Sequence, residues 1–219
     1  INLSMKRNPP RLGVLLAFEG IDQSGKKTLS ALLMERFREL GIQGERISFP
    51  DYTTPIGREL KFYLAGERDY PPQTRHLLFA ANRWERKRDI ESWLQRGKVV
   101  LANRYLASGV AYGMAHGLEK DWLWNLEEGL PKPDQTFLID IPPQVSFARK
   151  MKERDLYEEQ TDLLKRAREA YLDLASEGNW EVLDGTREVE SVFGDLYSRV
   201  REVLSSRGYE ITPSPRIHP

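Results

Sequence analysis

The stretch LGVLLAFEGIDQSGKKTLSALLMERFREL, residues 12–40, decides the fold of this 219-residue chain. It opens on a short continuous apolar run at residues 12–18, which predicts a buried strand. A glycine-containing turn follows, and from residue 29 onward leucine and phenylalanine recur at helical spacing. The order strand, loop and helix is the setting that a phosphate-binding loop requires.

The loop itself, GIDQSGK, places Gly20 and Gly25 around four residues and ends in Lys26. Glycines let successive backbone N–H groups curl around an anion, the start of the helix adds positive potential, and the lysine can reach the outer phosphates. Between a predicted strand and a predicted helix, we prefer this interpretation to a chance match of spacing. The residues expected to contact a triphosphate are Gly20, Gln23, Ser24, Gly25, Lys26, Lys27 and Thr28.

Lys27 stands where such loops usually offer a hydroxyl group to Mg²⁺. A protonated lysine cannot ligate a metal. Thr28 is no automatic substitute, because successive helical residues point about 100° apart. Three explanations stay open: Mg²⁺ is held through water by other groups, Lys27 itself neutralises phosphate charge, or activity is weakened.

Further short apolar runs alternate with amphipathic helical patterns, the longest of which covers residues 74–97. The alternation predicts an α/β fold of three layers, with helices on both faces of a parallel sheet. We expect one domain over residues 1–211 and a flexible tail at 212–219, which has turn residues and no periodicity. The expected strands lie at RISF (46–49), KVVLAN (98–103), TFLIDI (136–141) and WEVLD (180–184).

The composition excludes several classes of function. Lysine plus arginine and aspartate plus glutamate each total 33, so the formal net charge of zero predicts no general attraction to nucleic acid or membranes. The absence of cysteine excludes disulfides and thiolate chemistry, and three histidines make a structural metal site unexpected. Because no apolar run has the length of a signal peptide or membrane span, we expect a cytoplasmic protein.

Five motifs in order resemble the thymidylate kinases, P-loop nucleoside monophosphate kinases that pass the γ-phosphoryl group of ATP to dTMP. The likeness extends from about residue 12 to about residue 204. It implies a P-loop fold with a mobile lid, ATP and Mg²⁺ as cofactors, and a homodimer. The motifs are FEGIDQSGKKT (18–28), SFPDYTTPIGRELKFYL (48–64), HLLFAANRWE (76–85), NRYLASGVAYG (103–113) and GLPKPDQTFLIDIPP (129–143).

The resemblance implies that two residues of HLLFAANRWE bind the base. Phe79 would stack on thymine and Arg83 would hydrogen-bond its edge, which suits an aromatic ring and a planar set of donors. Without the resemblance, Phe79 would be assigned to the core and Arg83 to a solvated helix face. The surrounding motif favours the site interpretation.

The same matching implies the other acceptor contacts. Asp22 would accept a hydrogen bond from the sugar 3′-hydroxyl, and Tyr112 would leave little room for a 2′-hydroxyl. Arg104, assisted by Ser108, would grip the acceptor phosphate with its fork of donors, and its alternative is a surface salt bridge. The implied acceptor set is Asp22, Phe49, Tyr52, Phe79, Arg83, Arg104, Ser108 and Tyr112.

Two further departures from the family pattern accompany Lys27. Asn103 replaces the aspartate of the usual Asp-Arg pair, and Tyr52 stands where relatives with an FPER segment carry an arginine. We hypothesise that Lys27 and Asn103 are a linked pair that reduces reliance on tightly bound Mg²⁺. The candidate metal contacts are Thr28 and Asn103, if necessary through water.

The segment ARKMKERDLYEEQ (148–160) resembles the mobile lid of the family. Gln23 stands where some members carry a catalytic arginine, so the positive charge that phosphoryl transfer requires must come from elsewhere. We favour Arg154, with Lys152 second, against the alternative of a solvated charge run. The implied catalytic set is Lys26, Arg104, Arg154 and Lys152.

The same resemblance implies which residues contact the nucleoside part of ATP. Arg149 matches the position expected to stack on adenine. The turn DGTRE (184–188), with Gly185 and Thr186, resembles the loop that holds adenine through backbone contacts.

The function implied is phosphorylation of dTMP to dTDP by ATP in dTTP synthesis. Two alternatives stay open. One is a kinase for another pyrimidine nucleotide or nucleoside, because pocket shape decides the acceptor. The other is a catalytically impaired relative that binds nucleotide, which Lys27 and Asn103 keep in consideration.

Overall fold

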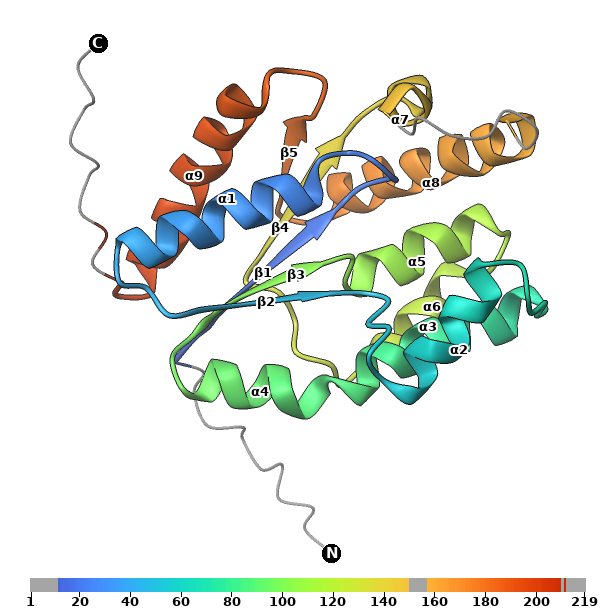
Figure 1. Cartoon of the computed structure of the whole chain (residues 1–219), viewed down its shortest axis with the longest axis horizontal. Helices are drawn as coiled ribbons and strands as arrows, with labels where there is room; N and C mark the ends of the chain where they lie inside the picture. The colour runs from blue at the N-terminus through green and yellow to red at the C-terminus, as the bar shows by residue number, and fades with distance from the viewer. Residues whose placement is uncertain (1–11, 150–156, 210, 212–219) are drawn as a thin grey trace, which may run out of the picture.

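The computed structural model describes residues 12–149, 157–209 and 211. Within them the strands form one five-stranded parallel sheet in the order β2-β3-β1-β4-β5 (Figure 1). This confirms the predicted α/β fold. The expected tail at 212–219 lies outside the described residues. The strands are β1 (Val14–Glu19), β2 (Gly44–Ser48), β3 (Val99–Asn103), β4 (Gln135–Asp140) and β5 (Trp180–Asp184).

Helices follow most of the strands. The pattern at residues 74–97 was expected to form one helix, but the structure divides it at Arg86, whose backbone N–H bonds the carbonyl of Arg83 at 3.1 Å. The helices of the described chain are α1 (Lys26–Glu39), α2 (Pro55–Leu64), α3 (Pro72–Glu85), α4 (Lys87–Gln95), α5 (Leu106–Ala115), α6 (Lys120–Glu127), α7 (Pro143–Arg149), α8 (Tyr157–Glu177) and α9 (Val189–Ser206).

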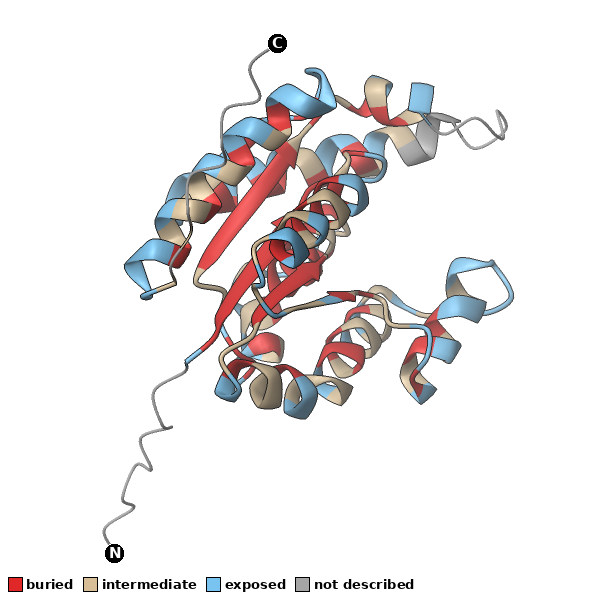
Figure 2. Cartoon of the chain, turned by 60° about the vertical axis from the view of Figure 1, so that its left-hand side comes forward, coloured by how far each residue is buried: buried red, intermediate tan, exposed pale blue. Residues whose placement is uncertain are grey.

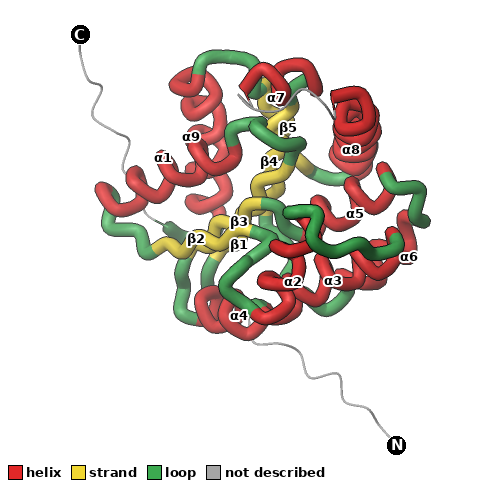
Figure 3. The backbone as a smooth tube through the Cα atoms, turned by 45° about the vertical axis from the view of Figure 1, so that its right-hand side comes forward, coloured by secondary structure: helices red, strands yellow, loops and turns green. Residues whose placement is uncertain are grey.

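The sheet is covered on both faces, so the central strands β1, β3 and β4 are almost entirely buried, whereas the edge strands β2 and β5 are partly exposed (Figure 2). Along β3 the side chains alternate, because successive residues of a strand point to opposite faces. Val99 and Leu101 pack with α1 and α9, whereas Val100 and Ala102 pack with α4. A further cluster joins α5, α6 and α8 on that second face. Figure 3 shows the strands between these two groups of helices.

The parallel sheet brings the loops after β1 and β3 together. Phe18 and Asn103 are register partners, and the backbone N–H of Arg104 donates to the carbonyl of Phe18 at 2.9 Å. In an open parallel sheet, ligands bind beyond the carboxyl ends of the strands. The phosphate loop and Arg104 therefore share the edge at which a ligand is expected.

The described chain ends meet at the opposite edge of the sheet. Tyr209 follows α9, and its hydroxyl group donates to the carbonyl of Gly97 at 2.7 Å. The same hydroxyl lies 3.4 Å from the carbonyl oxygen of Leu12. Among the described helices, none combines the length and apolar character needed to cross a membrane.

Candidate active site

The phosphate loop follows β1 and depends on its glycines. Gly20 has a φ of +133°, and a Cβ atom there would lie 2.4 Å from the carbonyl oxygen of Ile139. Gly25, with a φ of +105°, directly precedes α1. Residues with a side chain rarely adopt these backbone φ angles, so both positions favour glycine. The two glycines thus allow the chain to turn from the end of β1 into the start of α1.

Lys26 is only 6% exposed and its ammonium group is held inside the loop. Nζ donates to the carbonyls of Gly20 and Ile21 at 2.9 and 2.7 Å, and to Ser24 Oγ at 3.0 Å. Burial, followed by the charge of Arg104, lowers the pKa of Lys26 well below its ordinary value. A bound phosphate would compete with these oxygens for the ammonium group.

A cavity of about 530 Å³ surrounds the loop. The residues that line the cavity are distant in the sequence. They include residues from the loops that follow β1, β2, β3 and β5, and from α7. Of the predicted site residues, those lining it are Asp22, Gln23, Ser24, Gly25, Lys26, Lys27, Thr28, Phe49, Tyr52, Asn103, Arg104, Arg149 and Gly185. Gly20, Phe79, Arg83, Ser108, Tyr112 and Thr186 lie outside that lining.

Arg104 points its guanidinium group back toward the phosphate loop. Nη1 donates to the carbonyl of Gly20 at 3.2 Å, and Nη2 forms an ion pair with Asp22. The guanidinium carbon lies 5.4 Å from the ring centre of Tyr112. Burial raises the pKa of Tyr112 to about 12, so its phenol is neutral at physiological pH. Asp22, Arg104 and Tyr112 therefore form one cluster.

The predicted base-binding pair lies on α3. Arg83 is 3% exposed, and its Nε and Nη2 donate to both carboxylate oxygens of Glu127, with Nε at 2.8 Å. The guanidinium group fits here because residue 109 is glycine, where a Cβ atom would lie 2.3 Å from Nη2. Phe79 is half-buried, and its ring is nearly perpendicular to that of Tyr63, with the two ring centres 6.3 Å apart. Arg83 is thus buried and paired with Glu127 rather than solvated.

Sequence reasoning missed Glu127. It lies 44 residues from Arg83, and no motif connects the two positions. A buried carboxylate of this kind fixes the orientation of a planar guanidinium group. Only the fold reveals that the expected base-binding arginine has a partner.

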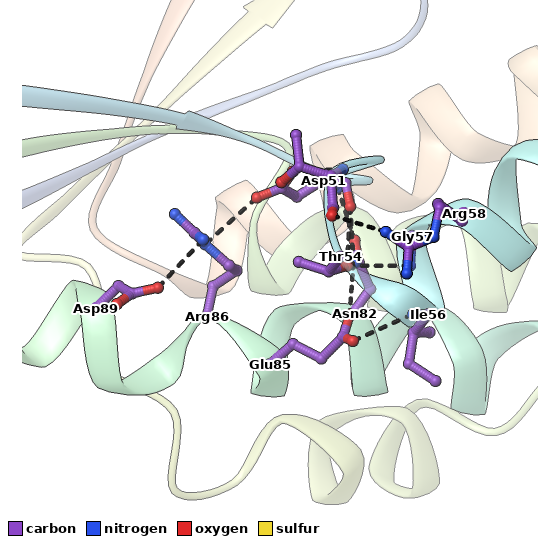
Figure 4. A network of polar contacts seen from close by, with 10 residues as sticks. Asp51, Thr54, Ile56, Gly57, Arg58, Asn82, Glu85, Arg86 and Asp89 are labelled. Atoms are coloured by element: carbon purple, nitrogen blue, oxygen red, sulfur yellow. Dashed lines mark hydrogen bonds and ion pairs between the residues drawn. The ribbon is translucent and has the colours of Figure 1, made fainter.

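Asn82, also missed, holds the loop that carries Phe49 and Tyr52 (Figure 4). It is 1% exposed; Oδ1 accepts from the backbone N–H of Asp51 at 2.7 Å, and Nδ2 donates to Thr54 Oγ1 at 2.8 Å. Nearby, Arg86 forms ion pairs with Asp51 and Asp89. The sequence signal that could have identified Asn82 is a polar residue on the buried face of α3.

Asn103 lies at the end of β3 and is 3% exposed. Its Nδ2 donates to Ser30 Oγ at 3.0 Å and to Ser48 Oγ at 3.2 Å. Ser30 Oγ donates in turn to the carbonyl of Lys27 at 3.2 Å. The side chains of Lys27 and Thr28 are exposed at the cavity. Asn103 and residue 27 are therefore connected through one serine hydroxyl.

Arg149 connects the phosphate loop with the turn after β5. Its Nη1 donates to the carbonyl of Gln23 at 3.1 Å and its Nη2 to that of Gly185 at 2.8 Å. Thr186 caps the same turn, where its backbone N–H donates to Asp184 Oδ1 at 2.9 Å. The expected catalytic residues Arg154 and Lys152 lie outside the described residues.

Comparison with known proteins shows the family to which the chain belongs. The thymidylate kinase family model matches residues 18–196. The chain is 37% identical to the thymidylate kinase of Plasmodium falciparum over 192 residues, covering 87% of this chain and 91% of that protein. It is 34% identical to the human thymidylate kinase, with 85% and 89% covered.

A solved structure shares the fold as well. Thymidylate kinase from Candida albicans superposes with a TM-score of 0.75 at 27% identity, covering 93% of this chain and 96% of that one. Sequence, phosphate loop and overall architecture thus lead to the same assignment. This chain belongs to the thymidylate kinase family.

Proposed function

We propose that this protein transfers the γ-phosphoryl group of ATP to the phosphate of dTMP. The observation that carries the proposal is the position of Arg104, which lies beside the phosphate loop in the same cavity and donates to the carbonyl of Gly20. An acceptor phosphate on Arg104 would therefore meet a triphosphate held by the loop. Family membership supplies the identity of donor and acceptor.

Phosphoryl transfer depends on positioning and on positive charge around the transferring group. Lys26 and the backbone N–H groups of the loop supply that charge on the donor side, and Arg104 supplies it on the acceptor side. In the proposal, Arg154 adds a further charge, with Lys152 as the second candidate. Arg149 holds the turn at Gly185 against the loop, where adenine would be bound.

Mg²⁺ is compatible with the oxygen atoms at the cavity. Asn103 Oδ1 is a buried amide oxygen without a hydrogen-bond partner among the described residues, and Asn103 lines the cavity. Mg²⁺ prefers oxygen ligands, keeps several waters and shares phosphate oxygens. We propose that Asn103 and Thr28 hold it, directly or through water. When bound, Mg²⁺ would neutralise charge on the phosphates.

Selectivity for the acceptor is proposed to come from α3 and α5. Glu127 fixes the guanidinium group of Arg83, so that its remaining donors keep one direction toward a base. Phe79 would stack on that base, and Tyr112 would lie against the sugar. Asp22 would exchange its ion pair with Arg104 for the 3′-hydroxyl as the phosphate arrives.

The experiment that tests the proposed function measures ADP release from ATP with dTMP, dUMP, dCMP, AMP or thymidine as acceptor, each with and without Mg²⁺. We expect Mg²⁺-dependent turnover that is selective for dTMP. Selectivity for another acceptor would replace the substrate assignment. Nucleotide binding without turnover would show a catalytically impaired relative.

We also propose a homodimer, as the family resemblance implies. Large apolar side chains are exposed along α2 and α3, including Leu64 at 52% and Leu77 at 48%. Such side chains gathered on adjacent helices favour association, because burying them releases water from apolar surface. A cytoplasmic location and the absence of nucleic-acid partners stay predictions.

A further inference from the structure

Glu19 is the last residue of β1 and is completely buried directly before the phosphate loop. Its Oε1 accepts from the backbone N–H of Tyr105 at 2.9 Å. Its Oε2 accepts from Ser108 Oγ at 2.5 Å and lies 3.3 Å from the hydroxyl of Tyr171. One carboxylate thus receives donors from the turn after β3, from α5 and from α8.

The donors that converge on Glu19 favour an ionised carboxylate at this position. The hydroxyls of Tyr171 and Ser108 lie 2.7 Å apart, so Tyr171 can donate to Ser108 while Ser108 donates to the carboxylate. Burial raises the pKa of Glu19, and the hydrogen bonds from Ser108 and Tyr105 oppose that rise. An ionised carboxylate, which only accepts, satisfies every donor in this group.

This buried anion lies behind two cations of the site. Lys26 and Arg104 repel one another, and this repulsion contributes to the lowered pKa of Lys26. Both attract the carboxylate of Glu19. Asp22 also pairs with Arg104, but its side chain is 55% exposed and is placed where a ligand would meet it. Glu19 is the counter-charge that a ligand cannot displace.

Glu19 also holds the backbone from which Arg104 extends. Arg104 has a φ of +58°, in the left-handed region that arginine rarely adopts. The bond from Tyr105 N to Glu19 fixes the next peptide group, and the bond from Arg104 N to the Phe18 carbonyl fixes the previous one. A residue in a costly backbone conformation persists only when its surroundings hold it there.

We propose that Glu19, oriented by Ser108 and Tyr171, is a positioning residue that holds Arg104 ready for the acceptor phosphate. The inference rests on the proposed function of the site. It reassigns Ser108, whose hydroxyl is committed to Glu19 and Tyr171, from a direct phosphate contact to a supporting one. Tyr171 connects this support to α8, which begins within the expected lid at 148–160.

The test compares kinetic constants of two substitutions that preserve volume. Glu19→Gln removes the charge, and Tyr171→Phe removes one hydroxyl. Because Arg104 serves the acceptor phosphate, we expect KM for dTMP to rise about tenfold in Glu19→Gln and several-fold in Tyr171→Phe. KM for ATP should stay nearly unchanged in Tyr171→Phe and should rise by a smaller factor than KM for dTMP in Glu19→Gln, because Lys26 also loses a counter-charge there. The matched controls are Glu45→Gln, at an ion pair on edge strand β2, and Tyr197→Phe on α9.

A second measurement is independent of turnover. The ¹⁵N resonance of Arg104 Nε, assigned through Arg104→Lys, should shift in both variants if Glu19 orients that side chain. Unchanged KM for dTMP and unchanged resonances, with a lowered melting temperature alone, would contradict the inference and leave only a packing role. Should Glu19→Gln fail to fold, Tyr171→Phe decides. A parent protein that does not phosphorylate dTMP contradicts the proposed function, whereas the resonances still decide the role of Glu19.

Discussion

Asn103 and the main-chain carbonyl of Lys27, at two positions expected to depart from the family pattern, are connected by the hydroxyl of Ser30. An aspartate at position 103 has no N–H to donate, so the Ser30 hydroxyl would turn toward it and release the carbonyl of Lys27. Because this carbonyl belongs to the backbone that carries the side chain of residue 27, Asn103→Asp should move that side chain and so change the effect of Lys27→Ser.

The first prediction concerns this coupling. In Lys27→Ser, Asn103→Asp and the double variant, ATP affinity is measured by calorimetry over a range of Mg²⁺ concentrations. We expect each single variant to make ATP binding depend more strongly on Mg²⁺, and the double variant to deviate from additivity by about 1 kcal/mol. Strictly additive effects would refute the linked pair.

His76 provides a prediction about pH. It is buried on α3, its Nε2 lies 3.0 Å from His116 Nδ1, and burial followed by the charge of neighbouring groups lowers its pKa to about 3. In the unfolded chain His76 binds a proton as the pH falls below 6.5, whereas in the native state it stays neutral until about pH 3. The contribution of His76 to the free energy of unfolding is therefore fully present above pH 6.5 and is lost progressively as the pH falls toward 3.

Between pH 7.5 and 5.5 we expect His76 to lower the free energy of unfolding by about 1.4 kcal/mol. Only the interval below pH 6.5, about one pH unit, contributes to this loss, and one unit corresponds to about that amount. Urea unfolding of the parent protein and His76→Gln at the two pH values measures it. The variant should lose less stability over this range. Equal losses in both proteins would show that His76 titrates normally.

At the scale of elements, the start of α2 determines how the loop with Tyr52 is held. Thr54 is the N-cap; its Oγ1 accepts from the backbone N–H of Gly57 at 3.1 Å and from Asn82 at 2.8 Å. Thr54→Ala should cost about 1–2 kcal/mol of stability, because it removes the cap and leaves a buried amide donor without that partner.

Thr54→Ser keeps the hydroxyl and is the matched control. We also expect KM for dTMP to rise in Thr54→Ala, because the loop between Phe49 and Thr54 lines the cavity. Denaturant unfolding and steady-state kinetics measure the two effects. Equal stability of the alanine and serine variants would show that the cap contributes nothing.

The expected lid carries the fourth prediction. Arg154→Ala should lower kcat by about 10³-fold while ATP affinity changes little, because an arginine that stabilises the transition state contributes mainly there. Single-turnover kinetics and ATP calorimetry separate the two quantities. Arg88→Ala, at an exposed position on α4, is the control. An unchanged rate would transfer the role to Lys152.

Contiguous features of the sequence were the most predictable. The strand β1, the glycines of the phosphate loop and Lys26 lie within 15 residues of one another. The short apolar runs predicted the strands of the sheet. The break at Arg86 was missed because α3 and α4 have the same periodicity. Glu127 and Asn82 were missed because their partners lie 44 and 31 residues away, and only packing brings them together.

For the whole molecule, the prediction is an oligomeric state. If α2 and α3 form the proposed dimer interface, Leu77→Glu should give monomers, because a carboxylate would be buried without a partner. Size-exclusion chromatography with light scattering measures the mass. Val182→Glu on β5, where the parent side chain is 47% exposed, is the control. Dimers in both variants would place the interface elsewhere.

The contact between Tyr209 and Leu12 has a consequence for the connectivity of the fold. Because these described ends lie side by side at the edge opposite the cavity, a short linker could join them and new termini could be opened in an exposed turn such as the one at Gly117. Such a circular permutant would leave the loops after β1 and β3 uninterrupted. The site depends on which strands are neighbours, and the polypeptide could start elsewhere without changing them.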